Sequence, residues 1–256
     1  MKVRSIEIVE DRTAQTRCDE GFLVVSRRVL RNIYTDGSKS EPYPCDVVSR
    51  PGSDAVVAVL YEVDAQGGLT VVLRESPRAP IYLRKFKQFE HPDGREYRSI
   101  VEVVAGLLEQ GDGPDREGLQ RRASIEALEE VGFRLPPSSF AEIGGESFAS
   151  PGTSDEKVFF CAGSTRDQAA STPSGDGTVM EESSELVRSE LAEAIQACRN
   201  GEIPDMKTEI GLLRLADHLG YIPQLGCYQH ELPPALKARY RRLGVAAAEP
   251  STKDPG

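Results

Sequence analysis

Three glutamates on one helical turn constrain this chain more than any other feature of its sequence. The segment 116–133 carries apolar residues at helical spacing, and Gly132 is typical of the position just after a helix. Glu126, Glu129 and Glu130 fall at i, i+3 and i+4, so they share one face. Like charges at these spacings destabilise a helix by roughly a few tenths of a kcal/mol per pair. A hard divalent cation would offset that repulsion, although the glutamates taken alone are better explained as a solvated acidic face.

The segments around this helix alternate between strand and helix patterns. Two β-rich runs in 54–76 flank Gly67 and Gly68, which predicts a hairpin. The remaining predicted elements are a strand that runs into a glycine loop (98–113), a strand (156–164) and two helices (188–201 and 204–220). The polar segment 165–185 is long for a loop in a compact domain, which indicates mobility or function.

Composition narrows the class of protein. The formal net charge of −10 argues against a nucleic-acid surface, which would need a basic stripe. No apolar run reaches the roughly 18 residues of a membrane span, and the first residues lack the apolar stretch of a secretory signal. The five cysteines are scattered without a CxxC pair, so reduced thiols and a cytoplasmic location are expected.

The glutamates belong to a longer pattern. Gly111 is followed by five residues and Glu117, then by seven residues and the run 125–133, Ile-Glu-Ala-Leu-Glu-Glu-Val-Gly-Phe. This pattern resembles the Nudix box, with every fixed position matched except the arginine, which is replaced by Ile125. The segments around the box resemble those of ADP-ribose and nucleotide-sugar pyrophosphatases; they are 73–80, 101–112, 148–163 and 181–215.

The resemblance implies a fold and a domain arrangement. The fold class is α/β, a Nudix α/β/α sandwich with a mixed central sheet and a small N-terminal β addition. Residues 1–50 would form that addition and serve homodimerisation, and residues 51–222 would form the Nudix hydrolase domain. The tail, 223–256, is expected to be partly helical, with a basic helix at 234–244 and a disordered end.

The resemblance also implies a metal site. Glu126, Glu129 and Glu130, with the carbonyl of Ala105, would bind two or three Mg²⁺ ions, for which Mn²⁺ is a possible substitute. Glu182 would act as the catalytic base that removes a proton from a metal-bound water. A solvated charge in a polar loop is the competing interpretation of Glu182.

Two further residues would contact the substrate, a nucleoside diphosphate sugar. Arg78 matches the arginine position of the family's substrate strand, and Glu102 precedes the Ala-Gly turn that enters the box. A surface ion pair for Arg78 and an exposed strand position for Glu102 are the plain alternatives.

The chain departs from the family near the box. Ala105 and Gly106 lie five residues before Gly111, which implies a five-residue insertion in the loop. The box arginine normally holds a neighbouring glutamate, and Ile125 cannot do so. Arg122, one turn before Glu126 on the same face, is a candidate substitute.

A second departure lies in the 181–185 segment. The family places a metal-ligating glutamate two residues after the base, where this chain has Ser184. That ligand is either lost or supplied by Glu181 or Glu185.

Three functions are therefore consistent with the sequence. The leading hypothesis is Mg²⁺-dependent hydrolysis of a nucleoside diphosphate sugar, with ADP-ribose as the first candidate. The second is a nucleotide-binding or regulatory Nudix domain with little turnover, favoured by Ile125 and Ser184. The third is a Nudix enzyme for another diphosphate, such as a dinucleoside polyphosphate or a nucleotide cofactor.

Overall fold

The computed structural model describes residues 21–173, 175, 184–241 and 243 of the chain. The strands are β1 (Val24–Leu30), β2 (Tyr43–Ser49), β3 (Ala55–Val63), β4 (Leu69–Ser76), β5 (Ile100–Glu102), β6 (Val104–Leu107), β7 (Phe140–Glu142), β8 (Ser147–Phe148), β9 (Lys157–Ser164), β10 (Glu185–Glu190), β11 (Tyr221–Ile222) and β12 (Cys227–Tyr228). The helices are α1 (Ala79–Tyr82), α2 (Arg116–Val131), α4 (Leu191–Arg199), α5 (Met206–Leu219) and α6 (Pro234–Lys237), with 3₁₀ turns at Leu83–Phe86, Pro137–Ser139 and Gln229–Glu231.

A mixed sheet lies at the centre of the fold. Its strands run in the order β10-β4-β3-β9-β7, while β5 pairs with β4, β6 with β3 and β8 with β9. The β3 strand is parallel to β9 and antiparallel to β4 and β6. The predicted mixed sheet and the predicted hairpin at 54–76 are therefore confirmed.

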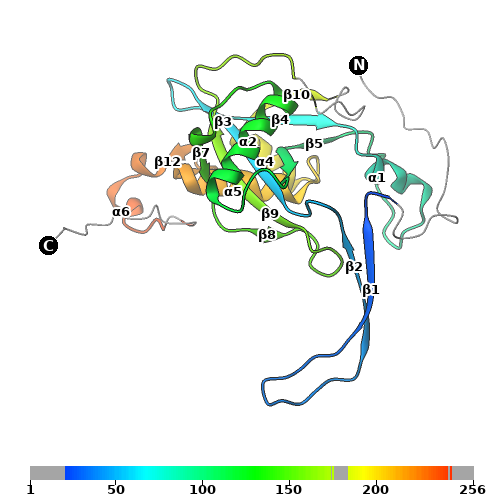
Figure 1. Cartoon of the computed structure of the whole chain (residues 1–256). Helices are drawn as coiled ribbons and strands as arrows, with labels where there is room; N and C mark the ends of the chain where they lie inside the picture. Colours follow the sequence, from blue (N-terminus) through cyan, green and yellow to red (C-terminus); the bar gives the residue numbers. More distant parts are fainter. Residues whose placement is uncertain (1–20, 174, 176–183, 242, 244–256) are drawn as a thin grey trace.

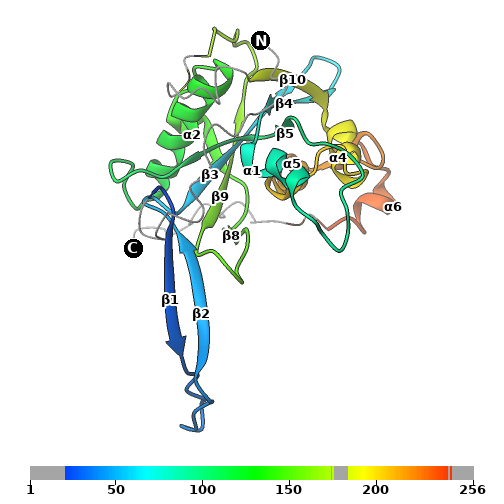
Figure 2. The same ribbon diagram turned by 90° about the vertical axis from the view of Figure 1, so that its right-hand side faces the viewer.

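Helices cover both faces of this sheet, with α2 on one side and α4 and α5 on the other (Figure 2). Alternate residues of β3 point to opposite faces of the sheet. Val56 and Ala58 pack in the hydrophobic cluster that contains Ala123 of α2. Val57 packs in the cluster on the other face, with Leu212 of α5. Because β3 is buried on both faces, its sequence is a continuous apolar run. The α/β/α sandwich follows from this double burial.

Both ends of the glutamate helix are defined by local signals. Asp115 caps the first turn of α2 by accepting a hydrogen bond from the backbone N–H of Gly118 at 2.9 Å. At the other end Gly132 has φ 77°, a left-handed conformation that favours glycine. The predicted extent of this helix is confirmed.

The structure differs from the sequence prediction in three elements. The single strand predicted in 98–113 is divided into β5 and β6 around Val103. The helix predicted from 188 begins at Leu191, because residues up to Glu190 pair with β4 as β10. The basic helix predicted at 234–244 extends only over α6, whose residues are all exposed and so gain no stabilising core contact.

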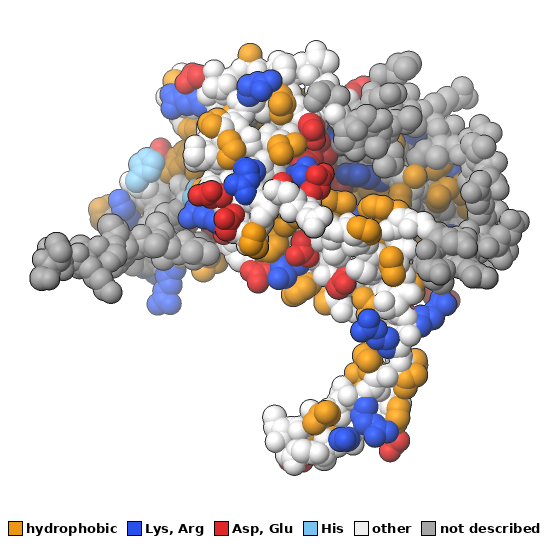
Figure 3. Space-filling view, in the orientation of Figure 1, with side chains coloured by type: hydrophobic (Ala, Val, Ile, Leu, Met, Phe, Trp, Pro, Cys, Tyr) orange, Lys and Arg blue, Asp and Glu red, His pale blue; other side chains and the backbone are white. Residues whose placement is uncertain are grey.

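A two-stranded ribbon of β1 and β2 projects from the body of the molecule (Figures 1 and 2). It exposes several large apolar side chains, among them Val29, which is 75% exposed, and Ile33, which is 73% exposed. Hydrophobic atoms along the ribbon are visible in Figure 3. Among the described residues, no helix combines the length and apolar character that crossing a lipid bilayer requires.

Candidate active site

The site is organised around the break between β5 and β6. The β3 and β4 strands pair with each other only near the turn that joins them. Farther from this turn they separate, and the continuous segment that contains β5 and β6 lies between them. This segment pairs first with β4 and then with β3, and Val103 is the residue at the change of partner. The N–H of Val103 donates to the hydroxyl of Thr208 at 2.9 Å. Helix α5 therefore fixes the point where the strand changes partner.

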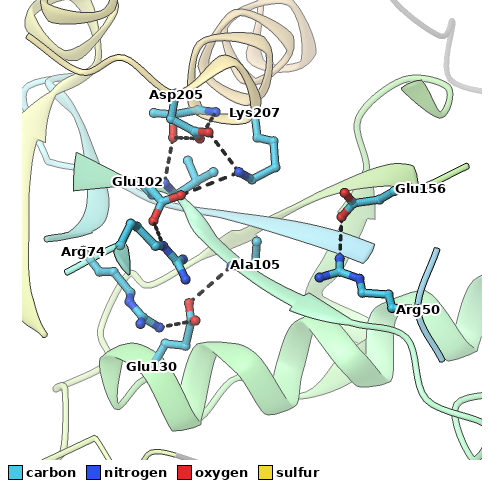
Figure 4. A network of polar contacts seen from close by, with 11 residues as sticks. Arg50, Arg74, Glu102, Ala105, Glu130, Glu156, Asp205 and Lys207 are labelled. Atoms are coloured by element: carbon cyan, nitrogen blue, oxygen red, sulfur yellow. Dashed lines mark hydrogen bonds and ion pairs between the residues drawn. The ribbon is translucent and has the colours of Figure 1, made fainter. Parts of the chain in front are cut away.

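Glu130 of α2 lies against the beginning of β6. Its carboxylate accepts a hydrogen bond from the N–H of Ala105 at 3.2 Å and forms an ion pair with Arg74 of β4, as Figure 4 shows. The side chains of Arg74 and Glu130 are almost completely buried. A buried carboxylate is stable only with such partners, so this pair holds the helix, β4 and β6 in one arrangement.

Glu126 lies one turn earlier on the same face, against Gly106. A Cβ atom added at Gly106 would overlap the Glu126 carboxylate, so Glu126 can keep this position against the strand only because residue 106 is glycine. Both Glu126 and Glu130 are buried, as is the helix face that they share. The solvated acidic face considered for these two residues is therefore wrong.

Arg122 is the cationic partner of this part of the helix. Its guanidinium lies 2.9 Å from Asp112, 3.0 Å from Glu109 and 3.6 Å from Glu126. Burial acts to lower the pKa of Arg122, but the bonds with Asp112 and Glu109 outweigh it, and the pKa is raised. Ile125, at the position of the box arginine, is 38% exposed. Arg122 was expected to replace the missing box arginine by holding Glu126, and the structure shows that contact.

A second ion-pair network lies at the end of β5. Arg78 donates from Nε to Glu102 at 2.5 Å, and the ammonium group of Lys207 lies 3.6 Å from the other oxygen of Glu102. Lys207 also lies 2.9 Å from Asp205, the capping residue of α5 (Figure 4). Glu102 is buried, so the exposed strand position considered for it is wrong. The structure thus brings Arg78 and Glu102 together.

Part of the polar segment 165–185 approaches the same helix. The N–H of Ser171 donates to the carbonyl of Gly132, and that of Gly175 donates to the carbonyl of Glu129 at 3.0 Å. Glu129 itself is half-buried. Glu181 and Glu182 lie outside the described residues.

The end of the 165–185 segment returns to the sheet. Glu185 begins β10 and pairs opposite Glu75, and Leu186 pairs opposite Arg74. The described chain on both sides of residues 176–183 therefore lies close to the α2 carboxylates.

The donors of this site are chemically suited to a divalent metal ion. Glu126 and Glu130 offer carboxylate oxygens, the ligands that Mg²⁺ prefers, and Gly106 leaves room for Glu126 at the strand. Among the described residues, no three Asp, Glu, His or Cys side chains are gathered around one point, and arginines pair with two of these glutamates. The residues fit a metal by chemistry and burial.

Comparison with known proteins identifies the family, although no family model matches the chain. The GDP-mannose pyrophosphatase of Salmonella arizonae is 32% identical over 147 residues, which are 57% of this chain and 71% of that protein. This chain belongs to the Nudix pyrophosphatase family. Two GDP-mannose pyrophosphatases are 28% identical to it, that of Citrobacter koseri over 70% of this chain and 83% of the relative, and that of Cronobacter sakazakii over 73% and 87%.

A solved structure supports the fold of this Nudix pyrophosphatase. A crystal structure of an ADP compounds hydrolase superposes with a TM-score of 0.52 at 16% identity, covering 78% of this chain and 93% of that one. The predicted α/β Nudix architecture and the predicted hydrolase class are confirmed.

The Nudix pyrophosphatase carries a long excursion between β4 and β5, which are paired strands. Residues 77–99 form α1, a 3₁₀ turn and a loop that together line an open cavity of about 580 Å³. Ion pairs fold this excursion on itself, from Arg84 to Asp93 and from Lys85 to Glu96, each at 2.8 Å. A cavity of this size is in the range of small-molecule sites.

Sequence reasoning missed four residues of this arrangement, Arg74, Asp112, Lys207 and Thr208. Two of them have partners far away in the chain, since Arg74 pairs with Glu130 and Thr208 with Val103. A usable signal existed only for α5, where Asp205 stands three residues before Thr208 in the manner of a helix cap.

Proposed function

We propose that this Nudix pyrophosphatase hydrolyses the pyrophosphate bond of a nucleoside diphosphate sugar and releases a nucleoside monophosphate and a sugar phosphate. The observation that carries the proposal is the buried pair Glu126 and Glu130, set against the strand start at Ala105 and Gly106. Two carboxylates buried side by side are costly even with their arginine partners, and a divalent cation bound to the diphosphate would give them a function.

Glu126, Glu129 and Glu130, with the carbonyl of Ala105, would hold Mg²⁺ or Mn²⁺. Such an ion neutralises the negative charge of the diphosphate and lowers the pKa of a bound water. Arg74 orients the carboxylate of Glu130, and Arg122 orients that of Glu126.

Glu182 is the proposed base that takes the proton from the attacking water. The support for it is the course of the flanking chain, because Gly175 bonds to the carbonyl of Glu129 and Leu186 pairs opposite Arg74.

Two substrates lead the candidates. ADP-ribose is the one favoured by the motif segments, and GDP-mannose is the one favoured by the names of the related proteins. The cavity formed by residues 77–99 is a candidate position for the nucleoside or sugar part, since Tyr82, Phe89 and Tyr97 line it.

The test is a substrate panel with Mg²⁺ or Mn²⁺. Purified protein is incubated with GDP-mannose, ADP-ribose, UDP-glucose, NADH and a diadenosine polyphosphate, and the released monophosphate is quantified by chromatography. We expect one sugar diphosphate to be cleaved fastest. Cleavage only of NADH or the polyphosphate would instead establish the third function, and tight binding of ADP-ribose without turnover would establish a binding domain.

We also propose that the ribbon of β1 and β2 contacts a second copy of the chain. The support is its exposed apolar surface, which monomeric proteins rarely carry on a projecting element. Light scattering after size exclusion should give twice the 28.0 kDa mass of the chain. Glu substitutions at both Val29 and Ile33 should give a monomer, whereas Leu236→Glu, at an exposed position of α6, should leave the dimer intact. A wild-type monomer would refute the proposal.

A further inference from the structure

We propose that the cavity of the 77–99 excursion binds an anionic group on a sugar ring of the substrate, a carboxylate or a phosphate, through Lys87 and Arg95. The proposal rests on the proposed function for the diphosphate part of the substrate. It narrows the substrate class to nucleotides with a negative charge beyond that of the diphosphate, a charge that an unmodified ribose or mannose does not carry.

The lining of the cavity carries excess positive charge. Its charged side chains are four cations and two carboxylates, namely Arg84, Lys85, Lys87, Arg95, Asp93 and Glu96. The ion pairs of Arg84 and Lys85 described above neutralise two of the cations. Lys87 and Arg95 pair with no carboxylate among the residues that the structure describes. The cavity therefore attracts anions, although the chain as a whole has a formal net charge of −10.

Arg95 is held in place by groups that do not neutralise it. Its Nη2 donates to the carbonyl of Gly201 at 2.5 Å and to that of Glu202 at 3.1 Å, in the turn between α4 and α5. The guanidinium also lies 4.9 Å from the centre of the Tyr97 ring. Because these bonds use one nitrogen, Nε and Nη1 can donate to an anion, and little side-chain entropy is lost when it binds.

Lys87 supplies the second cation from the other part of the excursion. It follows the 3₁₀ turn Leu83–Phe86, and its N–H donates to the carbonyl of Arg84 at 2.9 Å, which fixes its backbone. Its exposed side chain lines the same cavity as that of Arg95. The compact charge of a lysine beside the planar fork of an arginine suits a carboxylate or a phosphate.

The cavity lies next to the candidate active site. Tyr82 lines it and donates its N–H to the carbonyl of Arg78 at 2.9 Å, one helical turn or about 6 Å along the axis. Arg78 pairs with Glu102, which is directly opposite Arg74 in the β4–β5 pairing, and Arg74 pairs with Glu130. A substrate with its diphosphate at the α2 carboxylates could therefore extend into the cavity.

The chemistry of nucleotides identifies a sugar ring as the part that carries the extra charge. Nucleobases are uncharged near neutral pH, and the proposed function assigns the diphosphate to the metal ions. A further anionic group belongs to a sugar ring, either as the carboxylate of a sugar acid or as a phosphate ester. Lys87 and Arg95 can each contribute a charge-assisted hydrogen bond to such a group.

The experiment compares ligands that differ only in this charge. UDP-glucuronate is paired with UDP-glucose, and NADPH with NADH. Dissociation constants are measured by calorimetry after divalent metal has been removed with a chelator, so that no ligand is consumed. We expect the more acidic member of at least one pair to bind about 10-fold or more tightly. Equal affinities within both pairs, or no binding of either acidic ligand, would overturn the proposal.

Variants of Lys87 connect the preference to the cavity. Lys87→Met should remove most of the difference in affinity within the pair, and Lys87→Arg should keep it. Lys237→Met, which removes an exposed lysine of α6, is the matched control and should also keep it. The preference should weaken as NaCl rises from about 0.05 M to about 0.5 M, because exposed charges are screened. A preference unaffected by Lys87→Met would contradict the assignment.

The same titrations identify the anionic group. A preference confined to UDP-glucuronate assigns the cavity to a carboxylate, and one confined to NADPH assigns it to a phosphate. Melting temperatures within about 4 °C of the wild type would exclude unfolding of the Lys87→Met variant as the cause of lost binding.

Hydrolysis assays separate this proposal from the proposed function. If the wild type cleaves no diphosphate but prefers the acidic ligand through Lys87, the proposed function fails and the cavity assignment stands. If it cleaves a neutral nucleotide sugar and shows no preference within either pair, the proposed function stands and the cavity assignment fails.

Discussion

Replacement of Glu130 by Gln should reduce hydrolysis of the preferred substrate by about 10²- to 10³-fold, the scale of removing one preorganised electrostatic partner of a transition state. The change keeps the shape of the side chain and removes the charge that would bind the metal. Release of monophosphate at saturating Mg²⁺ is the measurement. We expect the variant to need a higher Mg²⁺ concentration than the wild type for its remaining activity, because an amide oxygen is a weaker ligand than a carboxylate.

The matched control is Glu193→Gln, the same change on the exposed face of α4. It should leave the rate unchanged. Stability must be followed in parallel, because Glu130→Gln leaves the buried guanidinium of Arg74 without its carboxylate. A folded Glu130→Gln protein with wild-type activity would rule out a role for Glu130 in the metal site.

Replacement of Arg122 by Met should lower the free energy of unfolding by about 3 kcal/mol or more, the cost of removing one partner from a buried ion pair. The side chain of Asp112 is only 7% exposed and that of Glu126 only 11%, so both carboxylates would be left buried without their cation. Chemical denaturation followed by circular dichroism gives the change in free energy. Activity should fall as well, by about 10- to 100-fold, because Glu126 loses the group that orients it.

The chain provides a neighbouring control for this experiment. Arg121 is the adjacent residue of α2, but its side chain is 43% exposed, its ion pair with Glu117 is long, at 3.7 Å, and it reaches Asp112 only through a hydrogen bond to the backbone carbonyl. Arg121→Met should therefore change stability by no more than about 1 kcal/mol. Asp112→Asn combined with Arg122→Met should recover part of the stability, because it removes one of the unpaired buried charges. Similar losses for the two arginines would contradict the assignment of Arg122.

The sequence was most informative where structure depends on neighbours in the chain. The spacing of Glu126, Glu129 and Glu130 sets one helix face because the helical repeat is local. The cap at Asp115 and the left-handed Gly132 are likewise properties of a few successive residues. The β-rich runs on both sides of Gly67 and Gly68 predicted the hairpin of β3 and β4 for the same reason.

Secondary structure was predicted less reliably where a segment pairs with a strand that is distant in the sequence. Residues 188–190 read as the start of a helix, yet they form the end of β10 because the edge of β4 was available to them. The 98–113 segment read as one strand, yet it changes partner at Val103 because β3 and β4 diverge there. Neither choice is encoded in local spacing, since both depend on where another strand lies.

By itself the sequence determined the carboxylate helix, the family pattern around it and the hairpin of β3 and β4, and it named Arg122 as a cation beside Glu126. Only the tertiary structure decided the other cation partners. Arg74 reaches Glu130 from β4, Arg122 also pairs with Asp112 of the loop, and Lys207 reaches Glu102 from α5. The physical reason is that an ion pair depends on distance in space, and folding brings together charges from different segments of the chain.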